Sequence, residues 1–160
     1  MGYQIVWILF ESTREKAMYE KMEIAVNHFN YFKTRSERVG RSFIALFENF
    51  SPATLGFDGL TASLDATAHT FDVEMFGRRF IAELSLLTKE SDVVGYVEYS
   101  EMFEGSRRLV EAFQINSQSQ VCDVSGKELM PVEDFSSKQS LFILNLIHLG
   151  LSKPIQRVAP

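Results

Sequence analysis

The sequence contains one cysteine and three histidines, and each shortage argues against a class of site. The single thiol, Cys122, cannot form an internal disulfide, which predicts a reducing, cytoplasmic location. His28, His69 and His148 lie far apart in the sequence, and none has a neighbour at metal-ligand spacing, so no metal site is predicted. The glycines form no phosphate-binding loop, and no cofactor is predicted.

Excess positive charge and long apolar runs are also missing. Lysine and arginine number 16 against 21 acidic residues, a net charge of -5, which argues against a surface that coats nucleic acid. The longest uncharged run, from Gln139 to Ser152, is shorter than the roughly 20 residues that span a bilayer. The first ten residues have neither the basic start nor the small-residue cleavage site of a signal peptide. We therefore expect no contact with a membrane.

What the sequence does contain is enough apolar material for one core. Fourteen phenylalanines in 160 residues supply a large aromatic area, and no linker divides the chain. We predict a single α+β domain over residues 1–160. It has a strand and a long helix in residues 1–50, an antiparallel sheet in residues 60–124, and a C-terminal helix in residues 131–150.

The clearest pattern is a stripe of apolar residues at alternating steps of four and three. Before it, Tyr3–Phe10 is rich in β-branched and aromatic residues and is interpreted as a buried strand, with the first turns of a helix as the alternative, and the capping box Ser12–Glu15 predicts a helix start. The stripe predicts either a coiled-coil seam that dimerises or an apolar face that packs on a sheet, which we favour; that face belongs to one long helix or to two helices with a bend near Gly40. Its members are Met18, Met22, Ala25, Phe29, Phe32, Ser36, Val39, Phe43, Leu46 and Phe50.

Alternating apolar and polar residues predict about five antiparallel strands after Pro52. Their short polar connections indicate a meander, because parallel strands need long crossovers. The expected strands are 60–65, 71–75, 80–86, 93–99 and 109–115, with at most an edge piece at 121–124. A second helix then follows, with Pro131 in its first turn and Phe135 on its apolar face.

Two groups of charged residues could carry chemistry. Asp72, Glu74 and Glu83 could face one another across a hairpin and hold a divalent cation, but the lysine that accompanies such acids in nucleases is missing. We favour a solvent-facing role for them. Paired arginines at two turns could bind an anionic ligand or an acidic partner, but we favour their interpretation as solvated turn residues. These are Arg78, Arg79, Arg107 and Arg108.

The surplus of apolar helix predicts a function in binding. The two helices carry more apolar surface than one sheet face covers, and uncovered apolar surface marks a partner site. We predict a non-enzymatic interaction module, such as a regulator, inhibitor, immunity protein or chaperone, that binds an unidentified protein and forms a homodimer. The expected partner-binding residues are Phe29, Phe32, Phe43, Phe142, Leu146 and Leu149.

Two other functions remain open. A pocket between sheet and helix could bind a small molecule or house an enzyme, with Asp72 or His69 as its polar group. The arginine turns could instead contact nucleic acid. The order of helix, antiparallel strands and helix resembles the outline of small bacterial secretion chaperones, immunity proteins and similar adaptors, but no diagnostic motif supports the resemblance and it transfers no site.

Overall fold

The protein has an α+β fold that divides into two compact units, residues 1–34 and 35–160. The computed structural model describes residues 2–53, 55–133 and 137–154, with side chains described from residue 13 onward. Helix α1 (Gly2–Phe47) forms the described part of the first unit and continues into the second. The second unit also contains seven strands and helix α2 (Ser137–Ser152). Within the described residues, neither helix has the length and hydrophobicity to cross a bilayer.

Helix α1 differs from the prediction at its start. Tyr3–Phe10 is helical, so the predicted strand is wrong, and the helix begins at Gly2 rather than at the capping box. A strand without a partner would leave its backbone groups unpaired, whereas a helix satisfies them internally. The helix continues without a break through Gly40, in agreement with one long helix and not with two. The Gly40 position is close to the His69 imidazole, because a Cβ there would lie 2.9 Å from Nε2.

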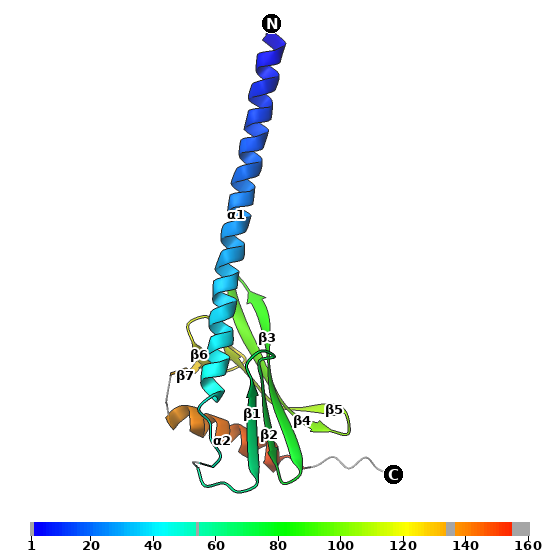
Figure 1. Ribbon diagram of the computed structural model, residues 1–160, viewed down its shortest axis with the longest axis vertical. Helices are drawn as coiled ribbons and strands as arrows, with labels where there is room; N and C mark the ends of the chain where they lie inside the picture. Colours follow the sequence, from blue (N-terminus) through cyan, green and yellow to red (C-terminus); the bar gives the residue numbers. More distant parts are fainter. Residues whose placement is uncertain (1, 54, 134–136, 155–160) are drawn as a thin grey trace. The chain divides into compact units, whose positions relative to one another are not determined.

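The sheet is an antiparallel meander, as predicted, but it has seven strands in sequence order instead of about five (Figure 1). The two additional strands are short and flanked by polar residues, which hides them from an alternation search. Pro131, predicted in the second helix, ends the last strand, and Phe135 lies outside the described residues. The strands are β1 (Leu60–Asp65), β2 (Thr70–Met75), β3 (Arg78–Lys89), β4 (Asp92–Phe103), β5 (Ser106–Ile115), β6 (Gln120–Cys122) and β7 (Glu128–Pro131).

Tight two-residue turns fix which strand ends lie together. The β2–β3 turn consists of Phe76 and Gly77, and the β4–β5 turn of Glu104 and Gly105, all with positive φ. Two positive φ values in succession are typical of a type I′ turn, where glycine carries no steric cost. In the sheet register, Met102 pairs with Arg79 on one side and with Arg107 on the other. Both turns therefore lie at the same end of the sheet.

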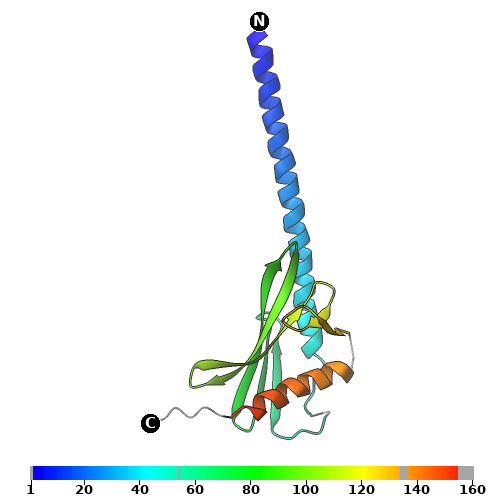
Figure 2. The same cartoon turned by 180° about the vertical axis from the view of Figure 1, so that it is seen from behind.

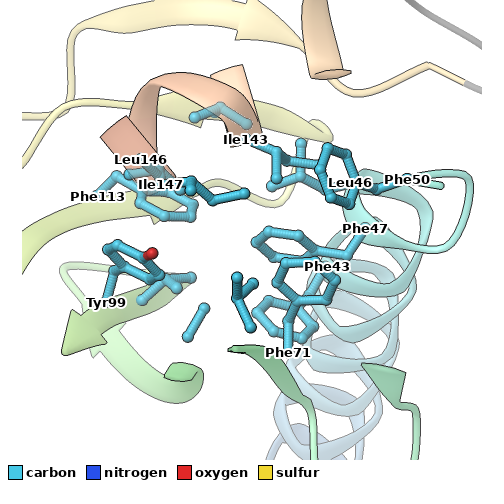
Figure 3. Packing of buried hydrophobic residues seen from close by; sticks show 14 of the residues in the cluster. Phe43, Leu46, Phe47, Phe50, Phe71, Tyr99, Phe113, Ile143, Leu146 and Ile147 are labelled. Carbon is cyan, nitrogen blue, oxygen red and sulfur yellow. The ribbon is translucent and has the colours of Figure 1, made fainter. Parts of the chain in front are cut away.

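The core of the second unit lies where the last turns of α1, one face of the sheet and α2 meet. Figure 2 shows α2 running across the strands. The apolar residues of the three elements point toward one another in Figure 3. Phe47 of α1 stacks on Phe71 of β2 with ring centroids 4.4 Å apart, and Phe80 stacks on Tyr99 at 5.6 Å. From α2, Ile143, Leu146 and Ile147 complete the cluster.

Candidate functional site

The first unit carries apolar side chains that face solvent. We define the N-terminal stripe as Met18, Met22, Ala25, Phe29 and Phe32. Met18, Met22 and Phe29 are 52%, 54% and 69% exposed. Phe32 is half-buried and meets Tyr31 edge to face at a centroid distance of 5.6 Å. Single exposed apolar residues are ordinary, but a series at helical spacing forms a continuous surface.

The same stripe is buried in the second unit. Val39, Phe43, Leu46 and Phe50 lie in the core, which agrees with the interpretation that this part of the helix packs on a sheet. Two of the six residues predicted to bind a partner are core residues, namely Phe43 of this stripe and Leu146 of α2. Phe142 and Leu149 are partly buried against the core. A partner-binding role for Phe29 and Phe32 stays a prediction.

The four arginines do not form a single patch. They lie at one end of the sheet, but neighbouring residues of a strand point to opposite faces. Arg79 lies within hydrogen-bond distance of Asp72, with 2.6 Å between Arg79 Nε and Asp72 Oδ1, and Arg107 pairs with Glu83. Arg78 and Arg108 both reach Glu101. Each of the four is thus engaged by a carboxylate of the protein itself, which leaves less of its charge for an external anion.

Glu101 is the centre of the most buried of these ion pairs. Its side chain is only 4% exposed. Arg78 donates from Nε to Oε1 at 2.7 Å and from Nη2 to Oε2 at 2.8 Å, and Arg108 donates to Oε2 as well. These bonds, led by the one from Arg78, lower the pKa of Glu101. The hydrogen bond to Glu101 likewise raises the pKa of Arg78.

The cluster around Glu101 also holds the end of helix α2. Arg78 donates to the carbonyl oxygens of Gly150 at 3.2 Å, Leu151 at 3.0 Å and Lys153 at 2.9 Å. Carbonyls at a helix C-terminus lack partners within the helix, and a cation there also opposes the helix dipole favourably. Lys153 Nζ in turn donates to the carbonyl of Val110 at 3.0 Å. These hydrogen bonds connect the C-terminal end of α2 to the sheet, so we assign the cluster a structural role.

A β-bulge aims one arginine at this cluster. The β4–β5 register shifts between Tyr99 and Ser100, so that β5 contains one extra residue. On the C-terminal side of the bulge, Phe113 and Ile115 of β5 face the core. On its N-terminal side, Val110 and Arg108 face the core. An extra residue reverses the alternation of a strand. Without it, Arg108 would point away from Glu101.

No known protein family, no curated protein and no solved structure matches this chain significantly. Its function therefore has to be argued from its own surfaces.

The carboxylates considered for a metal are used otherwise. Asp72 and Glu83 are each paired with an arginine, and Glu83 lies opposite Thr70 in the register instead of Asp72. Among the described residues, no group of three or more potential ligands could hold a metal ion. Cys122 is buried, and this burial raises the pKa of its thiol, which makes it less reactive.

A groove of about 420 Å³ lies beside His69, lined also by Gly40, Ile44 and Leu86. The imidazole packs edge to face against Phe43 at a centroid distance of 6.2 Å, and it leaves room for no side chain at Gly40. These contacts describe a packing role for His69. Binding of a small molecule at this groove, the alternative function raised by the sequence, stays a prediction.

Sequence reasoning missed Glu101 and the bulge. In β4, every second residue faces the core, and Glu101 belongs to this series. The alternation of the strand therefore predicts a charge on the core side of the sheet. The other members of the series are Val93, Gly95, Val97 and Tyr99. A charge at such a position requires a partner, and the nearby arginine pairs were the available cations. The bulge left no comparable signal in the sequence.

Proposed function

We propose that the protein is an interaction module, without enzymatic activity of its own, that binds a partner protein through the N-terminal stripe. The observation that carries this proposal is the exposure of Met18, Met22 and Phe29 at helical spacing. Apolar side chains in that arrangement are stabilised when a second helix or a groove covers them. The classes expected from the sequence are regulator, inhibitor, immunity protein and chaperone, and a member of any of them could bind its partner through such a surface.

The homodimer expected from the sequence is one form of this binding. In that case a second copy would cover the stripe, and the mass in solution would double. Light scattering on the full chain between about 1 and 100 µM, a range in which protein interfaces of ordinary affinity assemble, distinguishes a monomer from a dimer.

A pair of matched variants tests the proposal. Met22→Asp places a charge in the stripe, whereas Asn27→Asp places the same charge on the opposite side of the helix. Co-purification with quantitative mass spectrometry should show a partner that is held by the wild type and by Asn27→Asp but lost from Met22→Asp. Equal retention by both variants would show that the stripe is not the binding surface.

A further inference from the structure

A pocket of about 300 Å³ lies in the second unit, between helix α1 and the segments next to β6 and β7. Two of its six lining residues are arginines and none is acidic, although the protein as a whole has a net charge of -5. Positive charge is therefore concentrated at this place. We call it the arginine pocket, and its lining residues are Arg38, Arg41, Ser42, Ala45, Ser119 and Val132.

The charges of its two arginines are not neutralised by the protein. Among the described side chains, no carboxylate forms an ion pair with Arg38 or Arg41. Arg35, one turn earlier in α1, differs because its Nη1 lies 3.4 Å from Asp92 Oδ1. Arg38 donates to the carbonyl oxygen of Ser117 at 3.3 Å, and this neutral acceptor orients the guanidinium group without cancelling its charge. Both arginines thus keep charge and donors for an external anion.

Arg41 borders a second hollow, the groove beside His69. That groove is also lined by Glu37, whose carboxylate would repel an anion. The arginine pocket contains both arginines and no acid, so it is the better anion site of the two.

Two serine hydroxyls complete the polar wall of the pocket. Ser42 is 4% exposed, and its Oγ lies 2.8 Å from the carbonyl oxygen of Arg38 and 2.9 Å from Ser119 Oγ. A hydroxyl has one proton. When Ser42 donates it to Ser119, the proton of Ser119 is available to a ligand. Ser119 also has a φ of 60°, an uncommon conformation for a residue with a side chain and one that concentrates at functional sites.

These donors match a phosphate monoester better than a carboxylate. A phosphate monoester carries a charge of about -1.5 to -2 at neutral pH and presents three terminal oxygens. The pocket offers two positive charges and three donor side chains, Arg38, Arg41 and Ser119. A carboxylate has a single charge and two oxygens, so it would leave part of this set unused. Ala45 and Val132 supply apolar surface for the organic group of the ester.

We propose that the arginine pocket binds the phosphate group of a phosphate monoester, with Arg38, Arg41 and Ser119 as donors to its oxygens. This site is separate from the N-terminal stripe, because every lining residue belongs to the second unit. The proposal therefore stands or fails independently of the proposed function.

Titration of the ¹⁵N-labelled full chain tests the site by nuclear magnetic resonance in a phosphate-free buffer. The probes are phenyl phosphate and benzoate, which share the ring but differ in the anion. The backbone amides of Ser42, Ser119 and Val132 should shift with phenyl phosphate. We expect phenyl phosphate to bind at least about tenfold more tightly than benzoate at low salt, because it accepts more charge-assisted hydrogen bonds. Equal affinities, or no shift of these amides up to about 10 mM phenyl phosphate, would overturn the proposal.

Matched variants assign the binding to the pocket. Arg41→Gln should weaken binding of phenyl phosphate at least about tenfold. Arg79→Gln removes the same charge from an exposed arginine that is paired with Asp72, and should leave the affinity unchanged. Equal weakening by both variants would mean that only the overall charge matters, which would overturn the site. Thermal unfolding establishes that the variants are folded.

Ser119→Gly tests the hydroxyl separately. Glycine adopts a positive φ without steric cost, so the turn is retained while the donor is lost. Binding of phenyl phosphate should weaken by about three- to tenfold. An unchanged affinity would overturn the role of Ser119 as a donor.

A short phosphoserine peptide and its unphosphorylated form distinguish the sources of the phosphate group. If the phosphopeptide binds more tightly than phenyl phosphate and the unphosphorylated form does not bind, the ester belongs to a phosphorylated protein. If phenyl phosphate binds more tightly, the ester belongs to a small molecule. Both results support the site, whereas equal binding of the two peptides would overturn recognition of phosphate.

Discussion

Single residues decide how charge is accommodated at the turn end of the sheet. Arg79 and Asp72 form an exposed pair, with side-chain exposures of 55% and 29%, whereas Glu101 is almost completely buried. An exposed pair is screened by water and contributes little. A buried carboxylate, by contrast, leaves its partners uncompensated when it is removed. The same residue types thus have different energetic weight at neighbouring positions.

Glu101→Gln should lower the free energy of unfolding by about 3 kcal/mol, because Arg78 and Arg108 would lose the charge that pairs with them. Asp72→Asn is the matched control, since it makes the same chemical change in an exposed pair and should cost less than about 1 kcal/mol. Urea unfolding followed by circular dichroism measures both values. Similar losses in the two variants would contradict a special role for Glu101.

Because the pKa of Glu101 is lowered in the folded state, its contribution to stability depends on pH. A carboxyl group with a lower pKa in the folded state stabilises the fold above its unfolded pKa, about 4.3 for glutamate, and this contribution is lost as the pH falls through the folded value. The stability gap between wild type and Glu101→Gln should therefore be complete near neutral pH and should close in acid. Urea unfolding of both proteins between about pH 7 and pH 3 tests the trend. A constant gap would show that charge is not the cause.

At the scale of elements, Gly150 connects helix α2 to the sheet. A Cβ at this position would lie 2.6 Å from Cε1 of Phe80, and the carbonyl of Gly150 accepts a hydrogen bond from Arg78. Close approach of helix and strand thus depends on the absence of a side chain. In an ordinary helix position, replacement of glycine by alanine would stabilise the protein.

Gly150→Ala should instead destabilise the protein by about 1–3 kcal/mol, because the added methyl group must displace the buried ring of Phe80. Asn145→Ala, at an exposed position of the same helix, should be neutral or slightly stabilising. Thermal unfolding of the two variants compares the effects. A higher melting temperature for Gly150→Ala would show that helix and strand separate easily at this point.

The elements that sequence reasoning found are those with a regular period. The alternation in β2 to β5 identified the meander, and the steps of four and three placed Val39 and Phe43 on the buried side of α1. The prediction of a strand at Tyr3–Phe10 was wrong because a short apolar run fits a strand and a helix equally well. Residues 120–122 and 128–131 are too short for a period. The alternation of β4 marks Glu101 as a buried charge that needs a cation, but which arginines reach it depends on the register and on the bulge, which leave no signal in the sequence.

At the scale of the whole molecule, the two units use one helical pattern in two ways. The stripe is buried where residues 35–47 meet the core and exposed in residues 13–31. The sequence alone shows the continuous stripe but not the point at which the sheet stops covering it. That division is what makes the first unit a candidate for binding and the second a candidate scaffold.

Removal of residues 1–34 should leave a folded protein. Every buried residue of the core cluster lies at position 39 or later, and the Glu101 cluster is also complete in the second unit. We expect the fragment 35–160 to unfold cooperatively in urea with a midpoint close to that of the full chain. The fragment should also fail to retain the partner that co-purifies with the full chain, because the N-terminal stripe is absent. A fragment that is unfolded would show that the first unit stabilises the second, and a folded fragment that still retained the partner would place the binding surface in the second unit.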